Sequence, residues 1–211
     1  MLRALASSTG VPGMDRAYLF DLHVHTTRST DSSLRPGAAV SRARELGLRG
    51  MAITDHDRIT VLETAHPELA LVPGAELSTD WGDLLALGIS ELPERDLSVP
   101  KIVECIHAQG GVAVVPHPFT GAPNAMNDRV LDIIDIIDGL EVTSPRKSAN
   151  NRRARKVAQD HRKALVGGSD AHAPEEMGRG WTVCDLPDVE GLLEAIRTGR
   201  TRAFARPPRA R

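Results

Sequence analysis

Histidines and carboxylates gather at the ends of short apolar runs that are typical of β-strands. Five of the eight histidines stand at such ends: His23, His25, His56, His117 and His172. Glu76 and Asp170 supply carboxylates at further strand ends. Neutral imidazole and carboxylate oxygen are ligands that suit Zn²⁺, Mn²⁺ and Fe²⁺, and one carboxylate can bridge two ions. The pattern therefore predicts a multinuclear metal site, where bound water becomes a hydroxide nucleophile near neutral pH.

The spacing places several of these side chains on common faces. Alternate residues of a strand point the same way, so His23 shares a face with His25, and Asp170 shares one with His172. The sequence contains no G-x-S-x-G motif, and neither cysteine follows a strand beside a histidine. A serine or cysteine nucleophile is therefore not indicated.

Other polar residues are interpreted as structural. Three histidines fall in a loop or in helical patterns: His66, His107 and His161. Three aspartates recur at every third residue of "LDIIDIID" and predict one solvated helix face: Asp132, Asp135 and Asp138.

The strands that must position the site alternate with amphipathic stretches. Seven are predicted, at residues 19–25, 50–56, 70–77, 84–89, 111–117, 139–144 and 164–172. Helical patterns cover residues 36–47, 98–110, 127–138 and 150–164. This repeat predicts parallel βα units in an α/β barrel that is closed or nearly closed, with the site at the carboxyl ends of its strands. A doubly wound open sheet is the alternative, although no G-x-G-x-x-G or Walker motif supports it.

Composition limits the remaining possibilities. The 211 residues suit one barrel domain at 17–205, with a flexible arm at 1–16 and a disordered tail at 206–211. Residues 181–186 and 200–205 are expected as edge strands around a helix at 189–199. With 26 basic against 28 acidic residues, the chain offers no electrostatic footprint for nucleic acid or an anionic membrane. A cytoplasmic protein with no membrane partner is expected, and its oligomeric state stays open.

Five motifs resemble, in order, the signature motifs of the PHP (polymerase and histidinol phosphatase) family: "DLHVHTTRSTDSSLRP", "GMAITDHD", "PGAELST", "VVPHPF" and "GGSDAH". The resemblance implies a distorted (β/α)7 TIM-like barrel with phosphoesterase activity and two to three divalent metal ions, Mn, Zn or Fe. It implies these metal ligands: His23, His25, Asp31, His56, Glu76, Asp83, His117, Asp170 and His172. Of these, Glu76, Asp170 and His172 are assigned as catalytic.

Two positions depart from the family pattern. Asp31 lies in "STDSS", one residue longer than the S-D-G of many relatives, and is expected to join His56 at a third metal. Asp83 stands where many small relatives have a histidine. Either Asp83 binds a metal and favours harder ions such as Mn²⁺ over Zn²⁺, or it does not reach one and leaves the second site weak.

The expected substrate is a small phosphate monoester, either nucleotide-like or a metabolite phosphate, attacked by a metal-bound hydroxide. Arg146 and Arg179 are predicted to bind the phosphate, because guanidinium grips its oxygens in a fork. The charge balance and only six aromatic residues make a nucleic-acid polymer unlikely. The alternatives are an exonuclease or phosphodiesterase acting on short nucleic-acid ends, a non-catalytic PHP binding module, and an amide or ester hydrolase. Many amidohydrolases need a strand-end lysine that this chain lacks.

Overall fold

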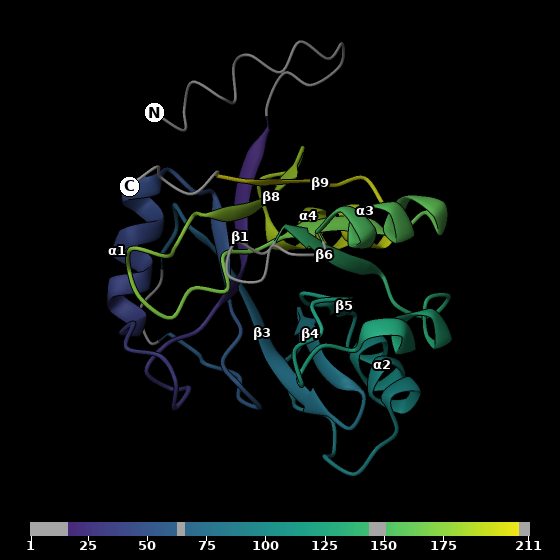
Figure 1. The fold of residues 1–211 in the computed structure, drawn as a ribbon. Helices are drawn as coiled ribbons and strands as arrows, with labels where there is room; N and C mark the ends of the chain where they lie inside the picture. Colours follow the sequence, from purple (N-terminus) through teal and green to yellow (C-terminus); the bar gives the residue numbers. More distant parts are fainter. Residues whose placement is uncertain (1–16, 63–65, 144–150, 207–211) are drawn as a thin grey trace.

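The computed structural model describes residues 17–62, 66–143 and 151–206, and within these ranges nine strands form one sheet (Figure 1). The strand order is β7-β6-β5-β4-β3-β2-β1-β8-β9. The strands are β1 (Tyr18–Val24), β2 (Gly50–Ile53), β3 (Ala70–Thr79), β4 (Gly82–Leu87), β5 (Val112–Val115), β6 (Gly139–Thr143), β7 (Ala164–Gly167), β8 (Gly180–Cys184) and β9 (Arg202–Ala205). The helices are α1 (Pro36–Leu46), α2 (Val99–Ala108), the short 3-10 helix η2 (Asn127–Asp132), α3 (Asn151–Asp160) and α4 (Val189–Arg197).

The two ends of this sheet meet and nearly close a barrel. β7 and β9 stand at opposite ends of the strand order, yet β7 lies in contact with both β8 and β9. The Thr182 hydroxyl joins β8 to β7, because it accepts from the Gly167 N–H and donates to the Gly167 carbonyl, each at 2.9 Å. The predicted distorted TIM-like barrel is therefore confirmed, and the expected edge strands at 181–186 and 200–205 correspond to β8 and β9.

The parallel βα arrangement predicted from the sequence does not extend to β4. β1, β2 and β3 are parallel, as are β5, β6 and β7, but β4 is antiparallel to both of its neighbours. Only Asp80 and Trp81 connect β3 to β4, and a two-residue turn can join only antiparallel strands. β8 is likewise antiparallel to β1 and β9.

Buried apolar side chains fix the strand that carries the first two histidines. β1 contributes Phe20 and Leu22 to a cluster that also contains Ile196 of α4. It contributes Leu19 to another cluster with Val40 of α1. Full burial of such a side chain stabilises the fold by roughly 1.5–3 kcal/mol. β1 is therefore held by two separate parts of the core. In Figure 1, α1 lies at the left of the molecule and α2 and α3 lie at the right.

The segment 127–138 corrects a second expectation. Only residues 127–132 are helical, as the 3-10 helix η2, and turns follow instead of an α-helix. Asp132 and Asp135 are exposed, as predicted. Asp138 is not on their face: its Oδ2 accepts from the Ala113 N–H at 2.8 Å and lies 2.8 Å from His107 Nε2. The chain becomes extended here because β6 begins at the next residue. The Asp138 side chain is therefore bonded to the backbone of β5 instead of lying on a helix surface.

The chain ends lie largely outside the described residues. This holds for the predicted arm at 1–16 and for residues 207–211 of the predicted tail. Arg206, the first tail residue, donates its backbone N–H to the Arg179 carbonyl at 2.7 Å. Among the described helices, none combines the length and the apolar character needed to span a membrane.

Candidate metal centre

A single buried carboxylate, that of Glu76 in β3, lies among four imidazole rings. Its Oε2 is 3.0 Å from His25 Nε2, 3.3 Å from His23 Nε2 and 3.4 Å from His56 Nδ1. Its Oε1 is 3.2 Å from His117 Nε2. These rings come from β1 and from the segments that follow β1, β2 and β5, so the carboxyl ends of the parallel strands converge here. A carboxylate whose two oxygens face different rings has the arrangement needed to bridge metal ions.

Three groups of donor atoms could each hold one ion. In each group the donor atoms lie within 4.8 Å of one another. The first group is His23, Glu76 and His117, and the second is His23, His25 and Asp170. The third group is His25, Asp31, His56 and His172. Nitrogen and carboxylate oxygen donors in sets of three or four suit divalent transition metals. The three groups together contain eight of the nine predicted ligands.

Asp31 reaches this cluster despite the longer loop. Its Oδ2 lies 2.9 Å from His172 Nε2 and 3.5 Å from His56 Nε2. Asp55 holds the loop that precedes Asp31. Its carboxylate accepts hydrogen bonds from the Thr26 N–H at 2.6 Å and from the Ser29 hydroxyl at 2.9 Å. The extra residue is therefore absorbed without moving Asp31 out of reach.

Asp83 stands at the edge of the cluster and not in any of the three donor groups. Its Oδ2 lies 3.8 Å from His117 Nε2, and it accepts a hydrogen bond from the Asn124 side-chain amide at 2.5 Å. Burial, followed by the nearby charge of Glu76, raises the pKa of Asp83 to about 6. A position beside His117 but outside the donor groups is compatible with either alternative for Asp83.

The electrostatics of the cluster are those of a site that binds cations. Burial lowers the pKa of His23, but the charges of Glu76, Asp170 and Glu141 outweigh it and raise that pKa well above its usual value. Burial would raise the pKa of Glu76, yet the His23 charge and the surrounding imidazole hydrogen bonds hold it well below its usual range. In the metal-free protein, a proton on His23 thus balances carboxylate charge that a metal would otherwise neutralise, whereas burial lowers the pKa of His25.

In three of the histidines, the Nδ1 atom contacts a neighbouring group outside the cluster or the backbone. His23 Nδ1 lies 3.3 Å from Glu141 Oε1, and His25 Nδ1 lies 3.4 Å from the Ser29 hydroxyl. His172 Nδ1 lies 3.0 Å from the Asp170 carbonyl. These contacts leave the Nε2 atoms directed at the cluster, which is the usual arrangement around ligating histidines.

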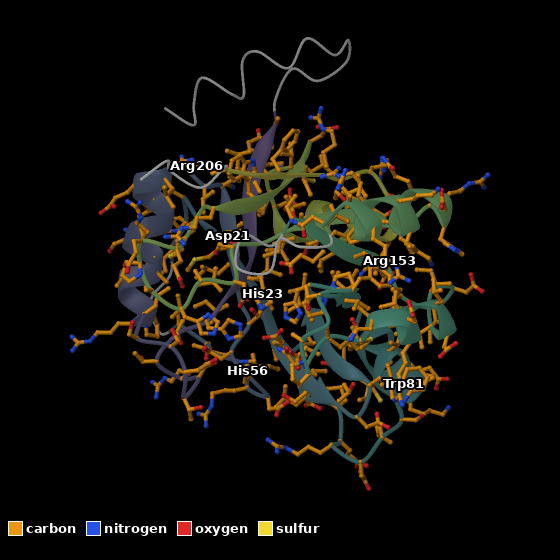
Figure 2. All side chains as sticks on the ribbon, viewed as in Figure 1. Asp21, His23, His56, Trp81, Arg153 and Arg206 are labelled. Atoms are coloured by element: carbon orange, nitrogen blue, oxygen red, sulfur yellow. The ribbon has the colours of Figure 1, made fainter. Side chains whose placement is uncertain are left out.

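Sequence reasoning missed four supporting residues: Asp21, Asp55, Asn124 and Glu141. Asp21 precedes His23 by two residues and accepts from the Ser169 and Gly178 N–H groups at 2.8 and 3.0 Å. Both residues belong to β1, and Figure 2 labels Asp21 above His23. Asp21 and Glu141 could have been noticed in the sequence, because each is an acidic residue within a mostly apolar predicted strand.

Not every predicted site residue is placed in the cluster. Arg146 lies outside the described residues, and Arg179 is exposed, with its carbonyl bonded to Arg206. The histidines interpreted as structural have other surroundings: His66 Nδ1 lies 3.0 Å from an Arg44 guanidinium nitrogen, His107 contacts Asp138, and His161 is exposed.

Comparisons with known proteins give matches over most of the chain. The profile of the PHP domain family matches residues 21–173, and that of a PHP-associated family matches residues 148–201. An uncharacterized protein of Methanocaldococcus jannaschii is 34% identical over 137 residues, which are 58% of this chain and 79% of that protein. The 5'-3' exoribonuclease Rnm of Escherichia coli is 43% identical over 72 residues, but these are 31% of this chain and only 24% of the exoribonuclease.

A solved structure shares the fold. It is a two-domain protein from Bacteroides vulgatus described as containing a predicted PHP-like metal-dependent phosphoesterase. It superposes with a TM-score of 0.73 at 20% identity, over 92% of this chain and 67% of that one.

Proposed function

Because the chain belongs to the PHP domain family, we propose that it is a metal-dependent phosphoesterase that hydrolyses a small phosphate monoester. The observation that carries the proposal is the buried Glu76 carboxylate among four imidazoles, with Asp170 beside it. Metal ions bound by these residues would acidify a water molecule and neutralise charge on the phosphate oxygens. Phosphate-ester hydrolysis depends mainly on such positioning and charge stabilisation, because little covalent chemistry is left to the protein.

The side chains of the cluster differ in their exposure, which indicates where a substrate would enter. His23 and His117 are 0% and 1% exposed, whereas His56 is 33% and Asp31 is 49% exposed. The phosphate is therefore expected to approach from the side of Asp31, His56 and His172. Glu76 and Asp170 would hold the buried ions, and His172 would hold an ion at the rim, which is the sense in which these three are assigned as catalytic.

A hollow beside Asp83 supports a compact, uncharged leaving group. It has a volume of about 650 Å³ and lies between the β3–β4 turn and residues 123–129. Its lining has the carboxylates of Asp80, Asp83 and Asp128 and the guanidinium of Arg129, and Asp128 is also paired with Arg153. A leaving group with further phosphates would be repelled there, whereas hydroxyl and amino groups would find acceptors. A nucleoside or a small hydroxylated metabolite fits this chemistry.

A nuclease is the second candidate, and the similarity to the exoribonuclease is the observation that favours it. In a nuclease, the exposed basic face of α3 would bind the phosphate chain. Two of its cations are paired within the protein, however, since Arg153 pairs with Asp128 and Lys156 lies 2.9 Å from Asp160. Arg155 donates to the Ala203 carbonyl. Polymer binding needs several uncompensated cations, so the small monoester is favoured.

A substrate screen distinguishes the two candidates. Phosphate release would be measured from nucleoside monophosphates, sugar phosphates and amino-alcohol phosphates with Mn²⁺, Zn²⁺ and Fe²⁺ in turn. Labelled single-stranded RNA and DNA would be tested in parallel. The proposal expects release from at least one class of monoester and little shortening of the polymers. Shortening of the polymers with every monoester left intact would contradict the proposed substrate class.

A further inference from the structure

We infer that Glu141 is a positioning residue that holds two histidines of the metal centre, His23 and His117, in their metal-binding orientations at once. The inference rests on the proposed metal dependence but concerns a residue outside the donor groups themselves. Glu141 is a buried residue of β6, and it contacts both His23 on β1 and His117, which follows β5.

Both oxygens of Glu141 are in use. Its side chain is 0% exposed, its Oε1 lies 3.3 Å from His23 Nδ1, and its Oε2 accepts from the His117 backbone N–H at 2.8 Å. On their opposite sides, both histidines face Glu76, with His23 Nε2 at 3.3 Å from Oε2 and His117 Nε2 at 3.2 Å from Oε1. Glu141 thus contacts the His23 ring and the His117 backbone, while Glu76 faces the Nε2 atoms of both rings.

The contact between Glu141 and His23 Nδ1 determines which ring nitrogen of His23 can bind a metal. A neutral imidazole has one N–H and one lone pair, and a metal can bind only at the lone pair. Metal binding through His23 Nε2 therefore requires the proton to sit on Nδ1, where Glu141 accepts it. An acceptor at this place excludes the tautomer that could not bind the metal.

The contact to His117 secures a backbone conformation that is otherwise unfavourable. His117 has a φ of 31°, in the left-handed region that residues with a side chain rarely adopt. The hydrogen bond from its N–H to Glu141 holds the backbone in that conformation and so fixes the point from which the ring departs.

Only a carboxylate can satisfy both partners. The His117 N–H is always a donor, and the metal-binding tautomer of His23 makes its Nδ1 a donor as well. The two bonds use different oxygens, so a glutamine, which has one acceptor and one NH₂ group, must direct a donor at a donor on one side. Glu141→Gln keeps the volume of the side chain and removes this double acceptance.

The same strand region offers a matched control. Asp138, just before β6, also contacts a histidine and a β5 backbone N–H, those of His107 and Ala113, but lies outside the three donor groups. Both contacts of Asp138 use the single oxygen Oδ2. The amide oxygen of Asp138→Asn can therefore keep them, while the negative charge is removed as it is in Glu141→Gln.

Metal titration tests the inference. Chelator-stripped wild-type protein, Glu141→Gln and Asp138→Asn would be titrated with Mn²⁺, with circular dichroism and urea unfolding recorded on the metal-free proteins. Glu141→Gln is expected to weaken Mn²⁺ affinity by roughly 10–100-fold, and Asp138→Asn to leave it within about twofold of wild type. Wild-type affinities for Glu141→Gln, or equal weakening in both variants, would overturn the inference. Failure of the wild-type protein to bind Mn²⁺ would instead count against the proposed function.

A second measurement needs no variant. Nitrogen-15 NMR of histidine-labelled wild-type protein loaded with Zn²⁺ reports which ring nitrogen of His23 carries the proton. The inference expects a hydrogen-bonded proton on Nδ1 and a metal on Nε2. A metal on Nδ1, or an Nδ1 proton with the shift and rapid exchange of a solvated group, would overturn it even if Glu141→Gln did not fold.

Discussion

Glu76 Oε2 lies 3.0 Å from His25 Nε2, although β2 separates the strands that carry these two residues. The contact is possible because the parallel strands β1, β2 and β3 all end on the same side of the barrel. A carboxylate in this position links rings from three strand ends, and the centre depends on it more than on any peripheral histidine.

Replacement of Glu76 is therefore expected to abolish hydrolysis. Glu76→Gln keeps the shape but halves the number of acceptor oxygens that face the imidazoles, so phosphate release should fall by at least about 100-fold. His25→Ala should behave alike. The control is His107→Ala, since His107 pairs with Asp138 and belongs to none of the donor groups. Steady-state kinetics would contradict the placement of the site if His107→Ala were as inactive as His25→Ala.

The stability of the metal-free protein should depend on pH through Asp83. Its pKa is raised from 3.8 to about 6 by burial and by Glu76, whereas in the unfolded chain it returns to its ordinary value. The folded state thus holds the proton more tightly between pH 4 and 6. Stability relative to Asp83→Asn should be highest below about pH 4 and should be lost, by up to about 3 kcal/mol, as the pH rises through about 6.

Urea unfolding of both metal-free proteins at several pH values measures this difference. Asparagine can still accept the Asn124 hydrogen bond, so the variant isolates the charge. A stability difference that does not change with pH, or one that grows as the pH rises, would contradict the assignment.

Gly168 tests how tightly the centre is packed. A Cβ at this position would lie 2.4 Å from His23 Cβ and 3.0 Å from Glu141 Oε1. Gly168→Ala must therefore displace His23, and we expect weaker Mn²⁺ binding together with a loss of roughly 1–3 kcal/mol in stability.

The matched control is Gly37→Ala in α1, where an added Cβ would meet no atom within 4 Å. Alanine favours helices, so this variant should be as stable as the wild type or slightly more stable, by up to about 1 kcal/mol. Normal Mn²⁺ affinity in Gly168→Ala would show that His23 has room to move.

The two predicted phosphate-binding arginines are tested by kinetics. Arg146→Ala is expected to lower kcat/KM by tenfold or more, on the order of 1.4 kcal/mol, because a guanidinium fork to a phosphate oxygen is lost. Arg179, exposed at the start of β8, is the weaker candidate, and Arg179→Ala should have a smaller effect. Unchanged kinetics in both variants would show that neither Arg146 nor Arg179 binds the phosphate.

The sequence predicted which polar residues lie together better than it predicted the connections between strands. The His23 and His25 pair could be predicted because strand alternation is local, and the strand ends could be predicted from where apolar runs stop. The hairpin of β3 and β4 could not, since an apolar run reveals that a strand exists but not its direction. The coiling of residues 133–138 into turns likewise depends on Asp138 bonding to β5, 25 residues away.

The supporting residues were hidden for the same reason. Glu141 contacts His23 across 118 residues of sequence, and Asp55 contacts Ser29 across 26. Their roles follow from which strands become neighbours and in what register. Asp21 and Glu141 differ from the apolar residues around them only in being acidic, and that pattern alone does not identify the partner.

The central claim is that phosphate release depends on metal ions held around Glu76. Chelator-stripped protein would be titrated with Mn²⁺ while phosphate release from a nucleoside monophosphate is followed, with metal content measured on the same samples. The account predicts no release without metal, a rise that reaches its plateau at two to three bound ions per chain, and no rise in Glu76→Gln. Full activity in the presence of a chelator, or a metal-saturated protein that releases phosphate equally well with Glu76→Gln, would contradict it.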